Sequence, residues 1–152
     1  MANGIAAKPT VFEGVEFRSK SEAIFAVAVN SIQNTVWQYE PHLEGFSFDV
    51  DFMLLCANAR NVKAFLIEYK PSLPSESFIE KCVASFSKFM DSHCWQSELC
   101  KGFWIIYGSP FADCKLESIA VHEFLGHSYG TDPATILQES FVEAKNVRFD
   151  LA

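Results

Sequence analysis

Two acidic residues and a lysine stand in the first half of the sequence, at positions that two neighbouring strands would bring together. Asp51 lies in the alternating run 46–54 (FSFDVDFML), and Glu68 and Lys70 lie at the end of the run 64–70 (AFLIEYK). Carboxylates are hard oxygen ligands that suit Mg²⁺ or Mn²⁺, and a neighbouring ammonium can orient an attacking water. Together these groups could support metal-assisted hydrolysis of a phosphodiester.

The spacing E-x-K also has a simpler interpretation, because alternating charges on an exposed strand face often only pair with one another. Asp49 and Asp51 would share a face one repeat apart, where two acidic side chains repel each other. Solvent would weaken this repulsion, and a bound cation would remove it.

A hairpin must position these residues. Side chains alternate between the two faces of a strand. The first run therefore predicts an apolar face of Phe46, Phe48, Val50, Phe52 and Leu54, and an opposite face of Ser47, Asp49, Asp51 and Met53. In the second run, Glu68 and Lys70 share one face, and Phe65, Ile67 and Tyr69 share the other. The turn formers Asn58, Arg60 and Asn61 lie between the runs, so we expect a hairpin in which Asp51, Glu68 and Lys70 converge.

The rest of the pattern predicts an α/β fold. Helices are expected at 21–33, with Ser19 or Ser21 as N-cap, at 75–93 after two prolines, and at 132–149 with Ile136, Leu137, Phe141 and Ala144 inward. Strands are expected at 35–39 and 102–108, the latter parallel to its predecessor, and residues 11–17 around Gly14 are either extended or a turn. This order predicts a single domain over 1–152 with a central mixed β-sheet of about four strands flanked by helices.

Glu22 stands in the first turn of the expected helix 21–33. A carboxylate there is favoured by the helix dipole, which is a sufficient structural reason for its presence. Alternatively, Glu22 projects from the helix end toward the acidic cluster.

Composition limits the kinds of partner. The formal net charge is −7 and the isoelectric point is about 5.0, with six basic and eight acidic residues in 1–70 and six and eleven in 71–152. Broad electrostatic capture of nucleic acid needs many Lys and Arg, so this balance speaks against it. No apolar run reaches membrane-spanning length and residues 1–10 lack a hydrophobic signal core, so we expect a cytoplasmic protein with no membrane partner.

Two other sets of metal-ligand residues have unsuitable spacing. Five cysteines include no C-x-x-C pair, and His93, Cys94 and Cys100 are irregularly spaced, so buried free thiols are expected. His122 and His127 resemble the zinc-peptidase pattern H-E-x-x-H with one residue too many. Positions five apart on a helix point about 140° away from each other, so we expect no shared metal there.

Four blocks follow one another in the first half of the sequence: FRSKSEA at 17–23, WQYEP at 37–41, VDFML at 50–54 and IEYKP at 67–71. Their order is similar to that in the PD-(D/E)xK nuclease superfamily, and most similar to that in small phage and mobile-element endonucleases, over about residues 12–71. The resemblance implies a restriction-endonuclease-like fold. Val50 stands where the family usually has proline, which removes a backbone constraint but no ligand.

Carried over to this chain, the resemblance implies that Asp51 and Glu68 bind Mg²⁺ or Mn²⁺ and that Lys70 assists the attacking water. Glu22 would complete the catalytic and metal-binding set, and the carbonyl of Tyr69 would be a further ligand. The implied activity is a divalent-metal-dependent DNA endonuclease of phage or mobile-element type, acting in the bacterial host cell.

Two alternatives remain open. The acidic composition suits a protein that keeps the nuclease fold but binds another protein, such as a phage-encoded inhibitor of a host defence complex (anti-CRISPR-like). A structure-selective enzyme that cuts RNA, branched DNA or single-stranded DNA is also compatible, and a junction-resolving enzyme would need a homodimer. The intact set of Asp51, Glu68 and Lys70 favours chemistry, and the net charge favours binding.

Overall fold

Five strands form a mixed central sheet. In spatial order they are β3 (Thr35–Tyr39), β4 (Phe52–Ala57), β5 (Val62–Lys70), β6 (Cys100–Tyr107) and β7 (Glu117–Ala120). Strands β5 and β6 are parallel, and the other neighbours are antiparallel. The structure is a computed structural model, and it describes residues 10–57, 60–127, 132–147 and 149–151.

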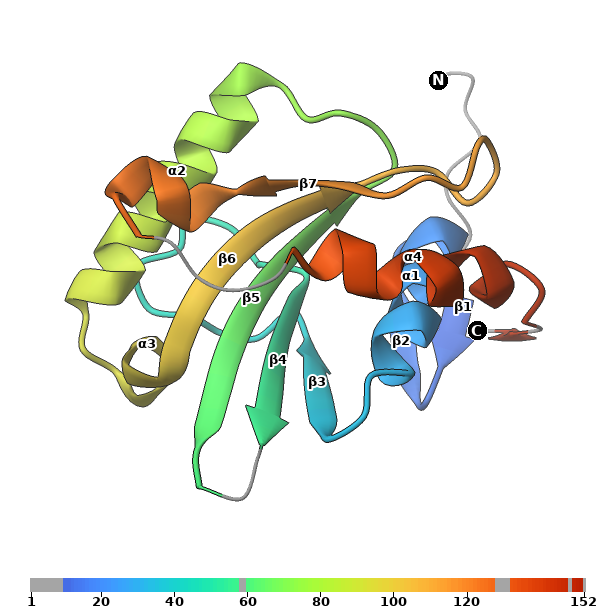
Figure 1. Cartoon of the computed structure of the whole chain (residues 1–152), viewed down its shortest axis with the longest axis horizontal. Coiled ribbons are helices and arrows are strands. Elements are labelled where there is room, and N and C mark those ends of the chain that lie inside the picture. Colours follow the sequence, from blue (N-terminus) through green and yellow to red (C-terminus); the bar gives the residue numbers. More distant parts are fainter. Residues whose placement is uncertain (1–9, 58–59, 128–131, 148, 152) are drawn as a thin grey trace.

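Helices cover both faces of this sheet (Figure 1). The helices α1 (Lys20–Asn30) and α4 (Pro133–Ala144) pack together on one face. The other face carries α2 (Glu76–Asp91), α3 (Trp95–Leu99) and the short 3₁₀ helix η1 (Val121–Leu125). A second, small sheet has the order β2 (Val15–Phe17), β1 (Thr10–Phe12) and β8 (Asp150–Leu151). The described residues thus form a single α/β domain, as predicted.

Side-chain caps fix where the helices begin. The Ser19 hydroxyl accepts a hydrogen bond from the Glu22 N–H at 3.1 Å, and the Ser75 hydroxyl accepts one from the Phe78 N–H at 3.2 Å. Each bond satisfies an N–H that has no partner within its helix. Of the two caps considered for the first helix, Ser19 is therefore the one used. The first turns of α1 and α2 lie toward the same end of the sheet (Figure 1).

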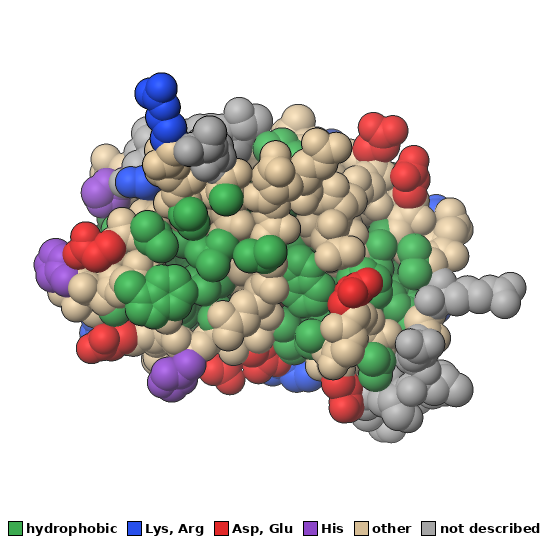
Figure 2. Space-filling view, turned by 90° about the horizontal axis from the view of Figure 1, so that it is seen from below, with side chains coloured by type: hydrophobic (Ala, Val, Ile, Leu, Met, Phe, Trp, Pro, Cys, Tyr) green, Lys and Arg blue, Asp and Glu red, His purple; other side chains and the backbone are tan. Residues whose placement is uncertain are grey.

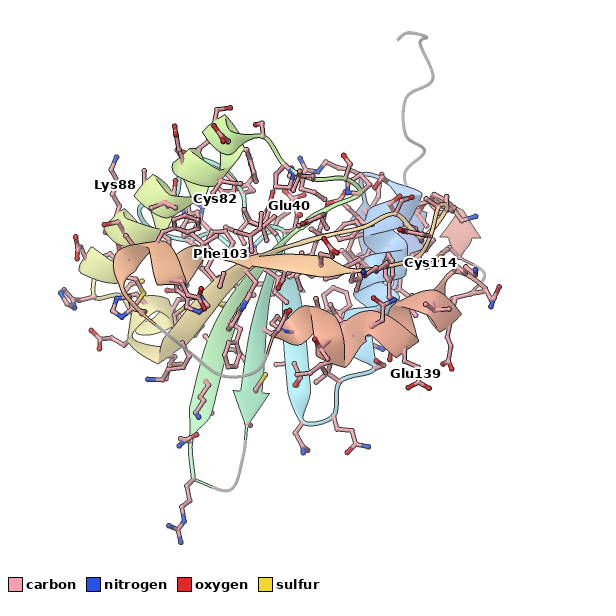
Figure 3. The ribbon with its side chains drawn as sticks, turned by 45° about the horizontal axis from the view of Figure 1, so that its top comes forward. Glu40, Cys82, Lys88, Phe103, Cys114 and Glu139 are labelled. Atoms are coloured by element: carbon pink, nitrogen blue, oxygen red, sulfur yellow. The ribbon has the colours of Figure 1, made fainter. Side chains whose placement is uncertain are left out.

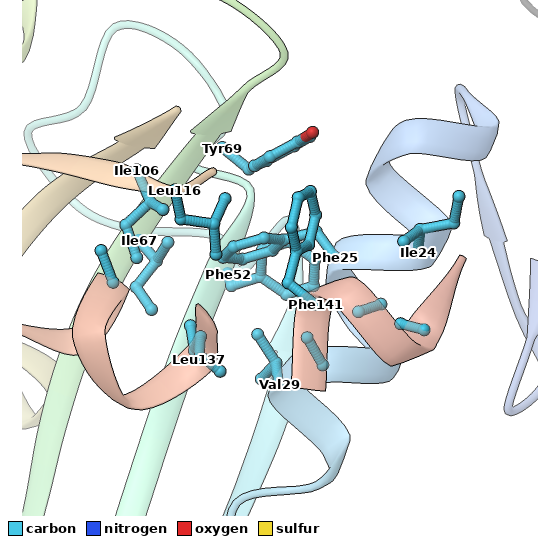
Figure 4. Close-up of a cluster of buried hydrophobic side chains, with 14 of the residues drawn as sticks. Ile24, Phe25, Val29, Phe52, Ile67, Tyr69, Ile106, Leu116, Leu137 and Phe141 are labelled. Atoms are coloured by element: carbon cyan, nitrogen blue, oxygen red, sulfur yellow. The ribbon is translucent and has the colours of Figure 1, made fainter. Parts of the chain in front are cut away.

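Aromatic side chains fill the core between the sheet and the α1–α4 pair (Figure 4). The Phe25 ring stacks on Tyr69 with centroids 4.5 Å apart and lies 5.5 Å from the Phe52 ring. Phe141 of α4 closes this group from the other helix, at 6.3 Å from Phe25. A separate apolar cluster, which includes Met53, Leu66 and Phe86, lies between the sheet and α2. Burial on both faces holds the central strands rigidly.

The prediction for the first strand was partly wrong. Strand β4 begins at Phe52, because β3 ends at Tyr39, its pairing partner, and Glu40 then takes a left-handed conformation with φ 48°. Residues 46–50 instead pass along α2, where Phe46 packs 5.6 Å from Phe89 and Phe48 packs 5.6 Å from Phe78. The predicted polar face is also wrong at Met53, which is 1% exposed because α2 covers that face.

Other differences are smaller. The sheet has five strands instead of four, because the four-residue strand β7 pairs with β6. Helix α4 ends at Ala144, five residues early, and Ile136 is 56% exposed instead of inward, whereas Leu137, Phe141 and Ala144 are buried as predicted. Residues 11–17 form the β1–β2 hairpin, which turns at Glu13 and Gly14. Asn58 lies outside the described residues.

The end of the molecule that carries the β4–β5 connection is partly apolar. Viewed from this end, hydrophobic side chains form a band across the middle of the molecule (Figure 2). An apolar cavity of about 120 Å³ lies between the sheet and the start of α4; it is lined by Ile32, Leu54, Cys56, Phe65, Ile67, Trp104, Pro133 and Ile136.

Within the described ranges, no helix has both the length and the hydropathy needed to cross a bilayer.

Candidate functional site

The β4–β5 register brings the two central acidic residues face to face. Phe52 pairs with Ile67, so Asp51, just before β4, comes opposite Glu68. The Asp51 N–H donates to Glu68 Oε1 at 2.9 Å, and the Tyr69 N–H donates to Asp51 Oδ2 at 2.8 Å. Both carboxylates are only 3% exposed. The backbone of each strand therefore holds the carboxylate of the other strand.

Lys70 completes the group predicted from the sequence. Its Nζ lies 3.3 Å from Glu68 Oε2 and 4.5 Å from the centre of the Phe78 ring on α2. The ammonium is thus held by an ion pair on one side and by the electron-rich face of an aromatic ring on the other. The lysine side chain remains partly exposed, so it can reach a bound substrate.

Glu22 faces the same group from the start of α1. Its Oε2 accepts a hydrogen bond from the Tyr39 hydroxyl at 3.1 Å, and its charge raises the pKa of both Asp51 and Glu68. Of the two interpretations of Glu22, a helix-end acid and a member of the cluster, the structure allows both at once. We call Glu22, Asp51, Glu68 and Lys70 the carboxylate cluster.

Negative charge exceeds positive charge in the buried part of this cluster. Burial, then the charges of Glu68 and Glu22, raise the pKa of Asp51 well above its ordinary value, against the Tyr69 N–H and Lys70, which lower it. Burial also raises the pKa of Glu68, and Lys70 opposes this effect most strongly. A further positive charge at this place would stabilise the ionised carboxylates.

Arg18 is a further member of the site, for which the sequence analysis predicted no role. Its guanidinium lies 3.3 Å from Glu40 Oε1 and 3.7 Å from Asp51 Oδ1, while its side chain is 65% exposed. Figure 3 shows that Glu40, one of these two partners, lies between α2 and α1. The sequence signal for this role is the position of Arg18 directly before the N-cap Ser19, at the end of the helix that carries Glu22. Arg18 can therefore contact both the cluster and solvent.

Tyr69 takes part through its backbone. Its side chain points into the α1–α4 core, where the hydroxyl donates to the Gly108 carbonyl at 2.6 Å, and burial raises the pKa of that hydroxyl. Its N–H orients Asp51. The residue thus fixes the end of β5 from both sides of the sheet.

The donor set fits a magnesium-like ion with few protein ligands. Within the described residues, no group of three His, Cys, Asp or Glu side chains is arranged to hold a metal ion. Mg²⁺, however, is commonly held by one or two carboxylates and completes its shell with water. Asp51 and Glu68 supply two hard oxygen donors, and burial, together with the charge of Glu22, raises the pKa of both. Asp51 and Glu68 are therefore a suitable pair.

The other candidate ligands are used elsewhere. His122 is buried with its ring 4.5 Å from the Trp104 ring, whereas His127 is exposed after η1 ends at Gly126. His93 pairs with Glu98 at 3.2 Å. All five cysteines are free thiols; Cys82, Cys100 and Cys114 are buried as expected, whereas Cys56 and Cys94 are only partly buried.

No protein-family model, curated protein or solved structure was found to match the chain. The function is therefore inferred from the carboxylate cluster and its surroundings.

The apolar cavity described above lies on the α1–α4 face of the sheet, whereas Lys70 contacts α2 on the other face. The cavity and the carboxylate cluster are therefore separate features of the described structure, and the function is inferred from the cluster.

Proposed function

We propose that the protein is a divalent-metal-dependent endonuclease that hydrolyses phosphodiester bonds of DNA on a restriction-endonuclease-like fold. The observation that carries this proposal is the interlocked pair Asp51 and Glu68, buried where β4 begins and β5 ends, with the Lys70 ammonium 3.3 Å from Glu68. Burying two carboxylates opposes stability unless charge compensates them. A site maintained against that cost is a candidate for chemistry.

Asp51 and Glu68 would hold Mg²⁺ or Mn²⁺, with Glu22 and the Tyr69 carbonyl in support. When bound, the ion would polarise the phosphate and lower the pKa of a water molecule. Glu22 belongs to this set because its charge acts on both central carboxylates. Tyr69 belongs to it because its backbone lies between the two residues of the E-x-K spacing.

Lys70 positions the attacking water in this proposal. Its ammonium, fixed between Glu68 and Phe78, would donate a hydrogen bond to the water oxygen and hold it in line with the phosphorus. The water oxygen forms the new bond to phosphorus as the bond to the leaving sugar oxygen breaks. The water supplies the hydroxyl to the phosphate and, overall, its other proton to the leaving oxygen.

Arg18 binds the phosphate. Its guanidinium is exposed, planar and only 3.7 Å from Asp51 Oδ1, so it can pair with a phosphate oxygen that arrives at the carboxylates. In the substrate-free state the same charge compensates Asp51 and Glu40. Arg18 would thus exchange a carboxylate partner for a phosphate partner.

The test is cleavage of a panel of linear, supercoiled, single-stranded and branched DNA in Mg²⁺ or Mn²⁺. Wild type should cut at least one substrate, and Glu68→Gln, which keeps the size of the side chain, should not. Glu98→Gln is the matched control, since Glu98 is an exposed acid paired with His93. If folded wild-type protein cuts none of the panel in either metal, the proposal is wrong.

A second proposal follows from the net charge of −7. In this proposal the acidic surface occupies a basic nucleic-acid channel of a host defence complex. It predicts saturable binding to such a complex that weakens with salt and is unchanged in Glu68→Gln. Binding that depends on the metal or on Glu68 would contradict it.

A further inference from the structure

Three lysines, one of them Lys70 of the carboxylate cluster, each lie over an aromatic ring. Lys70 Nζ is 4.5 Å from the centre of the Phe78 ring, Lys81 Nζ is 5.0 Å from that of Phe48, and Lys20 Nζ is 5.9 Å from that of Phe111. In each pair the ammonium occupies one face of the ring. Phe111 is exposed, and Phe48 and Phe78 are partly exposed. Cations and flat apolar surfaces therefore occur together at this end of the molecule.

These pairs stand on both sides of the cluster. On the α2 side, Phe78 contacts Lys70 directly, and the Phe48 ring lies 5.6 Å from the Phe78 ring. Both rings are half-buried, with part of each ring in solvent. They form one aromatic wall beside Lys70.

On the α1 side, Phe111 is 62% exposed and lies in the segment between β6 and β7. Lys20, which contacts it, comes two residues before Glu22 of the cluster. The same segment begins at Gly108, whose carbonyl accepts a hydrogen bond from the Tyr69 hydroxyl. Figure 3 shows Cys114 of this segment beside α1, across from α2. The cluster thus lies between an aromatic wall and an exposed phenylalanine.

Such a rim suits unpaired bases better than a duplex. A duplex keeps its bases stacked inside and presents phosphates, so binding it depends on many Lys and Arg. The chain instead has a net charge of −7. Single strands bind through stacking of bases on aromatic side chains, with a smaller set of cations along the backbone. The three lysines here, each beside a ring, match this second mode.

We propose that the ligand of this site is single-stranded DNA, whose bases stack on Phe111 on one side of the cluster and on Phe48 and Phe78 on the other. Lys20 and Lys81 then meet the phosphates that flank the stacked bases. This inference rests on the proposed function only in placing the scissile phosphate at the cluster between the two stacking positions.

The test measures fluorescence anisotropy of a labelled oligonucleotide in Ca²⁺, with an intact single strand, a blunt duplex of the same length, and an abasic single strand. Phe111→Ala removes one stacking surface. Phe124→Ala is the matched control, since Phe124 is 63% exposed but lies in η1, beyond the other end of β7. Phe111→Trp restores a stacking surface.

Wild type should bind the intact strand at least about tenfold more tightly than the duplex or the abasic strand. Phe111→Ala should weaken binding to the intact strand about tenfold and leave the abasic strand unchanged, and Phe111→Trp and Phe124→Ala should bind like wild type. Equal or tighter duplex binding, or equal effects of Phe111→Ala and Phe124→Ala, would overturn the proposal. If the protein binds single strands but cuts no DNA, the single-strand proposal holds and the nuclease proposal fails. If it cuts only duplex DNA, the nuclease proposal holds and the single-strand proposal fails.

Discussion

The Asp51 N–H donates to Glu68 Oε1 at 2.9 Å, and the Tyr69 N–H, directly after Glu68, donates to Asp51 Oδ2 at 2.8 Å. The carboxylate of each acidic residue is therefore held by the backbone beside the other. Two carboxylates are thereby kept close although both are buried and their charges repel. Hydrogen bonds to charged groups are strong enough to hold such an arrangement. The pair has a fixed geometry before any ligand arrives.

Divalent ions should stabilise the protein through this pair. At a free Mg²⁺ concentration about 100 times the dissociation constant, the free energy of unfolding should rise by about 2.7 kcal/mol. Asp51→Asn should abolish this rise, because it removes one charged ligand without changing the size of the side chain. Differential scanning calorimetry with and without Mg²⁺ measures the effect. Asp113→Asn, at an exposed position, should respond like wild type.

The stability of the metal-free protein should fall as pH rises. The pKa of both Asp51 and Glu68 is raised in the folded state, so the folded protein holds more protons than the unfolded chain between the ordinary carboxyl range and the raised values. Their contribution is therefore complete at acidic pH and is lost as pH rises through the folded pKa values. Thermal unfolding in EDTA between pH 4.5 and 8 should show a larger loss in wild type than in Asp51→Asn. Equal slopes would contradict the raised pKa of Asp51.

Lys70→Met should lower the cleavage rate by at least about a hundredfold, because the proposed donor to the attacking water is lost. The methionine also removes the ion pair with the buried Glu68 and the ammonium contact with the Phe78 ring, so the melting temperature should fall, and the rates are compared at a temperature where both proteins are folded. The control is Lys115→Met, since Lys115 also pairs with a glutamate, 3.6 Å away, but at an exposed site outside the cluster. Single-turnover kinetics with saturating substrate separate this effect from binding. A similar loss in both variants would refute the role of Lys70.

Arg18→Ala should act mainly on substrate binding. Removing the proposed phosphate contact should raise KM about tenfold or more and reduce the salt dependence of binding by about one charge. Arg18→Lys should recover only part of this loss, since lysine lacks the planar fork of the guanidinium. Measurements of kcat and KM at several salt concentrations test this. An unchanged salt slope would show that Arg18 only compensates Glu40 and Asp51.

The sequence by itself determined the elements whose signals are local. Ser19 and Ser75 cap helices that begin where predicted, and strand β3 has the predicted bounds. The alternation in β5 placed Glu68 and Lys70 on one face, and the helical crossover made β6 parallel to it. Capping and alternation depend on residues within a few positions of one another, so the chain carries them wherever it folds.

Only the tertiary structure decided the surroundings of the acidic residues. The run 46–54 alternates throughout, but the length of β3 limits the strand to its last part, and α2 covers the face that was expected to be polar. Arg18 contacts Asp51, and the charge of Glu22 acts on Asp51, because the α1–α4 pair packs on the sheet at one particular position. Contacts between elements distant in sequence depend on which surfaces are buried against each other, and no local pattern encodes that choice.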